Sequence, residues 1–182
     1  MGDLTEFREL LANRNPSELL KSAYDTGFRY ERDYHGCAQA LVGALQEVLG
    51  IENPDVFKAA SGLGGGIGLS CLSVCGGLSG GSMILSFLYG RERDNIEDQE
   101  GHRMVAYQLA SQLLEKYESR YNTWICKDIQ EQVFGRSFDL RDPGDFKALV
   151  DAGGHSRICP GVVGNAARMT VEVILKKEGI PT

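Results

Sequence analysis

A glycine-rich segment with two cysteines, residues 62–90, constrains this chain more than any other part of it. It contains ten glycines together with Cys71 and Cys75 in the run GLGGGIGLSCLSVCGGLSGGSMILSFLYG. Glycine loses more backbone entropy on folding than any other residue, so this density needs a structural reason. The usual reasons are backbone with φ above zero, or a close approach of the backbone to another backbone or to a bound group. We therefore expect something to lie close to the main chain here.

The glycine run does not match the phosphate-binding loops of nucleotide-binding proteins. The dinucleotide fingerprint G-x-G-x-x-G follows a strand, whereas the segment VFKAASG that precedes this run has a helical pattern. Leu69 or Cys71 stands where the third glycine of the fingerprint would be, and the motif G-x-x-x-x-G-K-[ST] does not occur. We therefore do not expect a phosphate-binding loop.

The second half of the segment predicts a central helix from about Ser70 to Leu88. Cys71 and Cys75 are four residues apart, so they would share one face of a continuous helix. The pairs Gly76/Gly80 and Gly77/Gly81 have the same spacing, and small residues at this spacing let a second backbone approach closely. We expect the other helices to pack round this one.

Apolar residues recur at helical spacing through most of the remaining chain, and no convincing alternating strand pattern is present. We predict an all-α fold of about six or seven helices in a single domain, residues 1–182. The region 135–158 is rich in glycine and proline, so we expect it to be irregular, with one helical turn near 146–150. The other expected helices are 3–14, 17–32, 37–50, 54–60, 95–121 (the longest), 123–135 and 159–177.

Charge and composition exclude several classes of protein. A net charge of −6 and a pI near 5.1 argue against a nucleic-acid-binding protein. The first ten residues carry acidic side chains and no long apolar core, so we expect no secretory signal, and no stretch reaches the apolar length of a membrane span. The five cysteines are odd in number and widely spread, which favours free thiols in a cytoplasmic protein over a disulfide framework.

Three cysteines, Cys37, Cys126 and Cys159, fall at or near the starts of predicted helices. The helix dipole and free N–H groups at such positions favour the thiolate, which is the form that binds metal and attacks disulfides. Three or four converging thiolates suit an iron–sulfur cluster or zinc, and the spacing alone does not distinguish them. Any one cysteine taken alone is better explained as a small buried hydrophobic residue.

The order of these motifs resembles that of a known family. A helix start Cys37-Ala38-Gln39-Ala40 is followed by GLGGGIG, then CGGLSG at 75–80, then Cys126, then Cys159-Pro160. This order is similar to that of redox-active proteins named for the pattern C, CGAxxG, C, C, and the resemblance covers most of residues 20–178. A related domain occurs in split-Soret cytochrome c, beside an iron–sulfur site.

The resemblance implies redox chemistry by cysteines and identifies four of them. Cys37, Cys75, Cys126 and Cys159 correspond to the four cysteines of the family. This chain departs from the pattern at two positions, because Gly77 replaces the alanine of CGAxxG and Cys71 is an additional cysteine. The haem-binding region of the cytochrome has no counterpart here.

Our first hypothesis is an electron-transfer protein with an iron–sulfur cluster. The four family cysteines would be its ligands, with Cys71 as a substitute or a neighbour. Five glycines would admit the cluster and direct backbone N–H groups at its sulfurs, which raises the reduction potential; these are Gly64, Gly65, Gly66, Gly76 and Gly77. The expected partner is a redox protein, for which the acidic chain suits a basic surface, and the exposed faces allow a homodimer.

Two alternatives stay open from the sequence. The first is a thiol–disulfide oxidoreductase in which Cys75 attacks and Cys71 or Cys37 resolves the mixed disulfide. The second is a zinc-stabilised interaction domain in which His35 or His155 joins the cysteines as a ligand.

Overall fold

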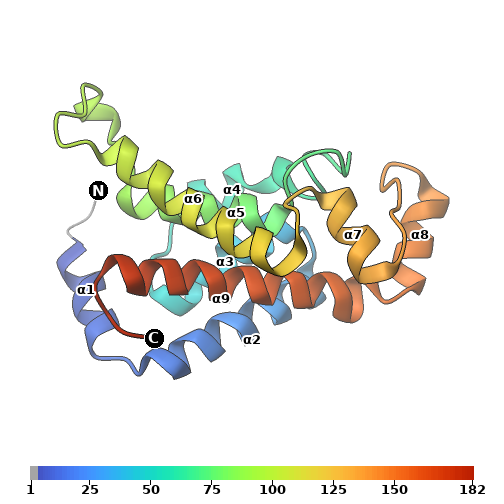
Figure 1. Ribbon diagram of the computed structural model, residues 1–182, viewed down its shortest axis with the longest axis horizontal. Helices are drawn as coiled ribbons and strands as arrows, with labels where there is room; N and C mark the ends of the chain where they lie inside the picture. Colours follow the sequence, from blue (N-terminus) through green and yellow to red (C-terminus); the bar gives the residue numbers. More distant parts are fainter. Residues whose placement is uncertain (1–3) are drawn as a thin grey trace.

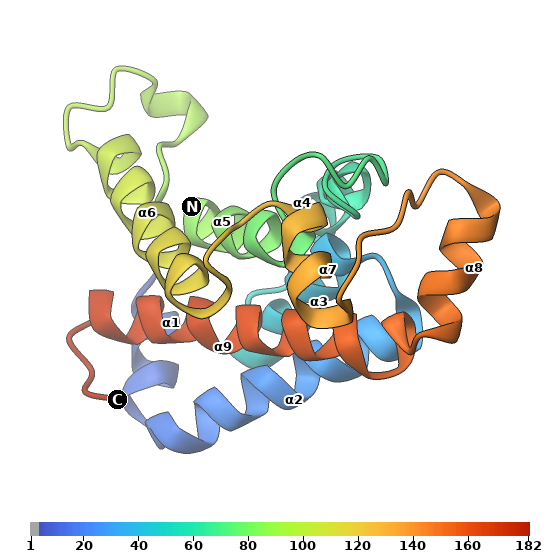
Figure 2. The ribbon, with the colours of Figure 1, turned by 45° about the vertical axis from the view of Figure 1, so that its right-hand side comes forward.

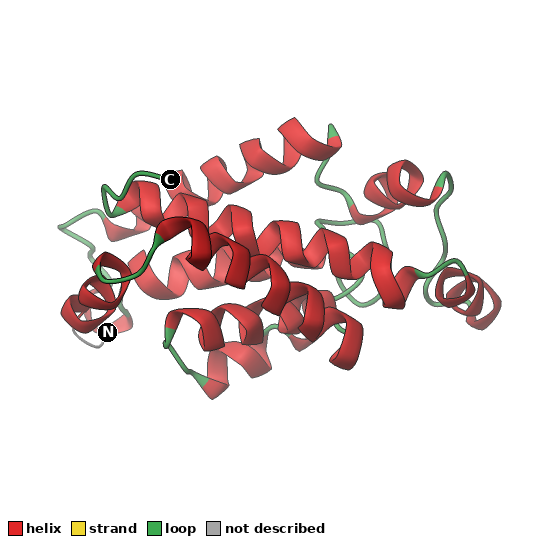
Figure 3. Cartoon of the chain, turned by 90° about the horizontal axis from the view of Figure 1, so that it is seen from below, coloured by secondary structure: helices red, strands yellow, loops and turns green. Residues whose placement is uncertain are grey.

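The computed structural model describes residues 4–182, and within that range it contains nine α-helices and no strand (Figures 1 and 3). The all-α prediction is confirmed, but the expected number of six or seven helices was too low. The expected start of the first helix, residue 3, lies outside the described residues. The α-helices are α1 (Leu4–Ala12), α2 (Pro16–Tyr34), α3 (Cys37–Leu49), α4 (Pro54–Ala59), α5 (Gly76–Tyr89), α6 (His102–Tyr121), α7 (Cys126–Phe134), α8 (Pro143–Asp151) and α9 (Cys159–Lys177).

Three short helical turns complete the description. Two of them are 3₁₀ helices, η1 (Ser61–Leu63) and η2 (Arg93–Asn95). The third, η3 (Gly154–Ile158), is a π-helical turn that leads directly into α9. A π turn widens the helix locally and is often found at functional sites, and this one comes immediately before Cys159.

Three helices begin with the same local device, an Asn-Pro or Asp-Pro pair. The side chain of Asn15 accepts hydrogen bonds from the backbone of Ser17 and Glu18 at 2.9 and 3.2 Å, and Pro16 then opens α2. Asn53 and Asp142 start α4 and α8 in the same way. The side-chain oxygen satisfies N–H groups that have no partner inside the helix, and proline has the φ angle that a first helical residue needs.

Helix α9, rather than the glycine-rich helix α5 expected from the sequence, is the centre of the bundle, and α5 packs against α3, α6 and α9. Helix α9 runs beside α2 along the length of the molecule, and α3, α5 and α6 also contact it (Figures 1 and 2). Helices α7 and α8 lie at the end of the molecule where α9 begins. A helix that is apolar on most of its circumference must be covered on most sides, which explains its burial. Its fully buried residues include Ala166, Ala167, Thr170, Val171, Val173, Ile174 and Leu175.

The α9 segment is also the one helix among residues 4–182 that is long and apolar enough to cross a membrane. This stretch runs from Gly154 to Lys177, and 72% of its apolar window is buried inside the protein. The central helix of a bundle has the same composition, so length and composition alone carry little weight. The absence of a membrane span stays a prediction.

Glycines allow the helices to approach closely at their crossings. A Cβ atom at Gly27 of α2 would lie 2.9 Å from the Cβ of Ala167 in α9. The backbone of α2 therefore packs directly against a side chain of α9. A Cβ at Gly80 of α5 would lie 2.7 Å from the carbonyl oxygen of Ala38 in α3. The expected close approach along the α5 glycines is therefore present.

Three expected boundaries were wrong. The helix predicted from Ser70 begins only at Gly76, so Cys71 lies in a loop and does not share a helix face with Cys75. The helix predicted over 95–121 begins at His102, because residues 96–101 form turns that end at Gly101 with φ 76°. The region 135–158, expected to be irregular, contains α8 and η3.

We predict that Gly80→Ala lowers the stability of the fold. Alanine favours a helix by up to about 1 kcal/mol over glycine, but its Cβ would collide with a backbone oxygen that cannot move without displacing α3. Overpacking of this kind costs roughly 1–3 kcal/mol, so the melting temperature should fall by several degrees. Gly62→Ala is the control, because nothing lies within 4 Å of its added Cβ. Equal melting temperatures for the two variants would contradict this account.

Candidate cysteine cavity

Four cysteines stand at the N-terminal ends of four different helices. Cys37, Cys126 and Cys159 are the first residues of α3, α7 and α9, and Cys75 immediately precedes α5. The prediction that Cys37, Cys126 and Cys159 lie at or near helix starts is thus confirmed. Helix starts from distant parts of the chain meet here because α3, α5 and α9 contact one another.

All four of these cysteines line one partly open cavity of about 100 Å³. Cys71 does not line it. The remaining walls are mostly apolar side chains from α7, α8 and α9, including Ile129, Val133, Phe134, Phe146, Leu149, Val162 and Val163. The polar side chains at the cavity are Glu31, Gln130 and His155. Gly64 and Gly65 of the glycine-rich segment also contribute to the wall.

The glycine-rich segment forms a left-handed turn over the cavity. Five consecutive residues, 65–69, have φ between 58° and 66°, and Cys71 follows with φ 59°. Gly65, Gly66 and Gly68 adopt this conformation without strain, whereas Ile67 and Leu69 each carry a cost of roughly 1–2 kcal/mol. The turn is closed by backbone hydrogen bonds from the amides of residues 68 and 71 to the carbonyls of residues 62 and 65, at 2.9 and 2.8 Å.

The glycines of this turn bring its backbone against cysteine side chains. The N–H of Gly65 donates to Sγ of Cys37 at 3.4 Å. A Cβ at Gly66 would lie 2.9 Å from the Cβ of Cys126 and 3.0 Å from the Cα of Cys71. A larger residue at position 66 would therefore push the turn away from both cysteines.

The start of α5 makes the second close approach. A Cβ at Gly76 would overlap Sγ of Cys37, and a Cβ at Gly77 would lie 2.5 Å from the hydroxyl of Tyr117. That hydroxyl is buried without a nitrogen or oxygen partner and is directed at the thiol of Cys75. The expected glycine positions 64, 65, 66, 76 and 77 thus all lie beside the cavity or its cysteines.

Backbone hydrogen bonds join the cysteine-bearing segments 71–75 and 124–127. The N–H of Cys75 donates to the carbonyl of Trp124 at 2.8 Å, and the N–H of Cys126 donates to that of Ser73 at 2.9 Å. Val74 and Ile125 form an isolated antiparallel bridge between them. These bonds hold Cys75 and Cys126 in one rigid unit although they are 51 residues apart.

Burial raises the pKa of the thiols in the cavity. The pKa of Cys37, Cys75 and Cys159 is raised chiefly by desolvation, and the pKa of Cys126 is raised chiefly by its hydrogen bond with Cys71. The sequence-based expectation that helix starts favour the thiolate at Cys37, Cys126 and Cys159 was therefore wrong for the metal-free protein. The helix dipole contributes only about 0.3–1 kcal/mol at most sites, which is less than the cost of burying a charge.

Backbone N–H groups oppose part of this effect. Those of Gly77 and Leu78, together with the Tyr117 hydroxyl, lower the pKa of Cys75, and that of Gly65 lowers the pKa of Cys37. These donors stabilise negative charge on sulfur, and they would do so equally for a thiolate bound to a metal.

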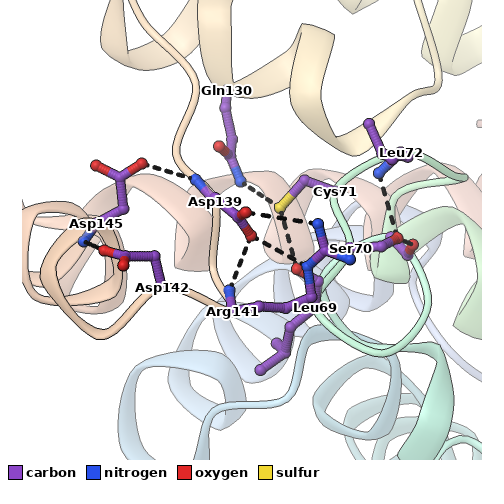
Figure 4. Close-up of polar contacts among 10 residues, drawn as sticks. Leu69, Ser70, Cys71, Leu72, Gln130, Asp139, Arg141, Asp142 and Asp145 are labelled. Atoms are coloured by element: carbon purple, nitrogen blue, oxygen red, sulfur yellow. Dashed lines mark hydrogen bonds and ion pairs between the residues drawn. The ribbon is translucent and has the colours of Figure 1, made fainter.

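Cys71 has a different environment from the other four cysteines. The hydrogen bond from Cys126 lowers the pKa of Cys71 to about 6. Burial raises this pKa, whereas hydrogen bonds from the Leu140 amide and the Gln130 side chain lower it further. Figure 4 shows the amide of Gln130 directed at Sγ of Cys71, with the Asp139–Arg141 ion pair beside this thiol. Cys71 is thus the thiol most readily ionised in the metal-free protein.

Glu31 is a functional candidate that the sequence analysis missed. It lies on α2, is only 4% exposed, lines the cavity, and its Oε2 atom has no hydrogen-bond partner. Burial raises the pKa of this carboxyl to about 8. A signal was available, because Glu31 continues the inward stripe Leu19, Ala23, Gly27 at intervals of four residues.

The two histidines considered as zinc ligands lie together at the edge of the cavity. Their rings are stacked with centroids 4.2 Å apart, and Phe146 packs edge-on against His155. Burial and the neighbouring His35 lower the pKa of His155. Among residues 4–182, no group of three or more His, Cys, Asp or Glu side chains has the geometry to hold a single metal ion.

A comparison with protein-family models identifies this cysteine pattern. Residues 35–173 match the model described as "Putative redox-active protein (C_GCAxxG_C_C)", and this range includes all five cysteines. The chain belongs to this family. The resemblance inferred from the order of the motifs is therefore confirmed, and a redox role follows from it. The pattern in the printed description has glycine before the cysteine (GCAxxG), whereas in the segment 75–80 of this chain, CGGLSG, glycine follows the cysteine. Comparisons with curated proteins and with solved structures return no match.

We predict that Glu31 makes the metal-free protein less stable as the pH rises. Between pH 4.5 and about 8 the folded protein keeps a proton on Glu31 that the unfolded chain has lost. The free energy of unfolding should therefore fall by up to about 1.4 kcal/mol per pH unit over this range. In Glu31→Gln this contribution is absent, so the variant should gain stability over the natural chain as the pH rises.

Urea unfolding at several pH values measures this difference. Glu118→Gln, which changes an exposed glutamate on α6, is the matched control and should leave the pH dependence as it is. The account fails if Glu31→Gln and the natural chain have parallel stability curves from pH 5 to pH 8.

Proposed function

We propose that this member of the redox-active family transfers electrons through an iron–sulfur cluster bound in the cysteine cavity. One observation carries the proposal: four thiols from four helix N-termini line a single cavity. Cys37, Cys75, Cys126 and Cys159 would be the ligands. Cys71 lies outside the cavity wall and is not included in this set.

The residues at the cavity fit such a group. Four cysteine thiols are the usual ligand set of an iron–sulfur cluster. All four of these thiols line the same cavity. Glu31 supplies a buried carboxyl whose Oε2 lacks a partner, and in its protonated form it can donate a hydrogen bond to sulfur.

When bound, the cluster would supply one-electron redox chemistry. The N–H groups of Gly65, Gly77 and Leu78 stabilise negative charge on Cys37 and Cys75. Hydrogen bonds to the sulfurs favour the reduced state and so raise the reduction potential. The apolar side chains of α7, α8 and α9 limit the access of water, which also tunes the potential.

The partner in this proposal is a redox protein. The chain has a net charge of −6, which suits a partner with a basic docking surface. All five cysteines are free thiols, which is compatible with the cytoplasm as the location.

A second candidate function is thiol–disulfide exchange. The observation that favours it is the position of Cys71, which lines a surface pocket and whose Sγ accepts a hydrogen bond from Nε2 of Gln130 at 3.4 Å. The pKa of Cys71 is also lowered, and a thiolate is the attacking species. The roles expected from the sequence change in this case. Burial raises the pKa of Cys75, so Cys71 is the better attacking thiol.

Replacement of single cysteines tests the ligand set. In protein purified without oxygen, we expect Cys37→Ser, Cys75→Ser, Cys126→Ser and Cys159→Ser each to lose most of the bound iron and the visible absorbance, because each removes one of four thiolates. Cys71→Ser is the matched control and should keep the iron content of the natural chain. Iron, acid-labile sulfide and zinc per chain are measured together with the visible spectrum.

Two results would contradict the proposal. The first is natural protein without iron or sulfide even after anaerobic reconstitution. The second is iron lost from Cys71→Ser but kept in one of the other four variants, which would show that the cavity cysteines are not the ligand set.

A further inference from the structure

Cys71 lies between the cysteine cavity and the protein surface. It lines a second pocket, of about 250 Å³, whose other walls include the exposed side chains of Lys127, Asp139 and Arg141. Cys126 lines the cysteine cavity but not this surface pocket, whereas Cys71 lines the surface pocket but not the cavity. Cys71 is only 3% exposed, whereas Cys37, Cys126 and Cys159 are half-buried. The surface pocket is a place where a small oxidant can contact Cys71.

The sulfurs of Cys71 and Cys126 are held next to each other. One amide nitrogen, Nε2 of Gln130, donates to Sγ of Cys71 at 3.4 Å and to Sγ of Cys126 at 3.7 Å. The orientation of this amide is fixed, because its Oε1 accepts a hydrogen bond from the buried N–H of Phe138 at 2.8 Å.

The backbone holds the two cysteines in the same relation. Lys127 follows Cys126 in the chain, and its N–H donates to the carbonyl of Cys71 at 2.8 Å. Gly66 packs against both cysteines at distances that leave no room for a side chain. The pairing therefore depends on the left-handed turn that gives Cys71 its positive φ.

We propose that Cys71 and Cys126 form a regulatory disulfide that withdraws Cys126 from the cavity. The inference rests on the proposed function in one respect, namely that Cys126 is a cluster ligand. The disulfide leaves Cys37, Cys75 and Cys159 as the only thiols at the cavity. A cluster that needs four thiolates is then released or is not loaded.

The chemistry balances with a peroxide as the oxidant. The Cys71 sulfur attacks one oxygen of hydrogen peroxide, the O–O bond breaks, and the products are a sulfenic acid at Cys71 and one water molecule. The Cys126 sulfur then attacks the Cys71 sulfur, an S–S bond forms, and the S–O bond breaks to release a second water. Two thiols have lost two electrons and two protons, and the peroxide has taken them up.

Disulfide mapping tests the pairing whether or not the protein contains iron. The reduced full-length chain is treated with one equivalent of hydrogen peroxide, the remaining thiols are alkylated, and the peptides are identified by mass spectrometry. We expect the number of free thiols to fall from five to three, with Cys71 linked to Cys126. Cys159→Ser is the matched control and should form the same link, whereas Cys71→Ser should not.

The pairing is overturned if another pair, such as Cys37 and Cys75, is the main disulfide. It is also overturned if Cys71 accumulates as sulfinic acid while Cys126 stays free. Far-UV circular dichroism of each variant verifies that it is folded before oxidation.

Iron retention tests the regulatory role separately. After the same peroxide treatment, the natural chain should lose iron in step with formation of the disulfide, and Cys71→Ser should lose it several-fold more slowly. Equal rates of iron loss from the two proteins would overturn the regulatory role of the disulfide, but they would not contradict the cluster itself. If neither protein ever contains iron, the cluster and the withdrawal of a ligand both fail, and the peptide map still decides the pairing.

Discussion

The contact of bare backbone with sulfur is the interaction on which the rest of this site depends. At Gly66 and Gly76 the main chain approaches Cys71, Cys126 and Cys37 so closely that no Cβ atom fits between them. The N–H of Gly65 donates to Sγ of Cys37. The left-handed turn places these glycines, and its cost is concentrated at Ile67 and Leu69, which have positive φ without being glycine. Strain of this kind persists where the surrounding structure enforces it, and it is frequent at functional sites. The bundle, with α9 at its centre, provides the enforcing framework.

Burial keeps the cavity thiols and one carboxyl in their protonated forms. In the metal-free protein, burial keeps protons on Cys37, Cys75 and Cys159 and on the carboxyl of Glu31. A bound metal group of the kind proposed would reverse this, because a coordinating thiol gives up its proton. The donors that surround the sulfurs, from Gly65, Gly77 and Leu78, would then act on thiolates. Binding would be coupled to proton release, and the carboxyl of Glu31 lies at the same cavity.

The fold class, most helix positions and the placement of Cys37, Cys126 and Cys159 near helix starts could be predicted from the sequence, because apolar periodicity and helix-start residues are local signals. The start of α5 could not. Ser70 to Val74 continues the apolar pattern of α5, but positive φ at Cys71 and the hydrogen bonds to the segment 124–127 override it. The thiol pKa directions at helix starts were also missed, since burial is a property of the whole fold. Glu31 and Gln130 were overlooked because a polar residue on an apolar helix face gains its meaning only from what it faces.

The central claim is that Cys37, Cys75, Cys126 and Cys159 together hold an iron–sulfur cluster in the cavity. The most direct test is a crystal of anaerobically prepared protein, measured on both sides of the iron absorption edge. The account predicts one compact anomalous peak for iron, bounded by these four sulfurs, with the sulfur of Cys71 outside the coordination sphere. An iron peak at the Cys71 surface pocket, or no iron peak in protein whose four cavity thiols are reduced and free, would contradict it.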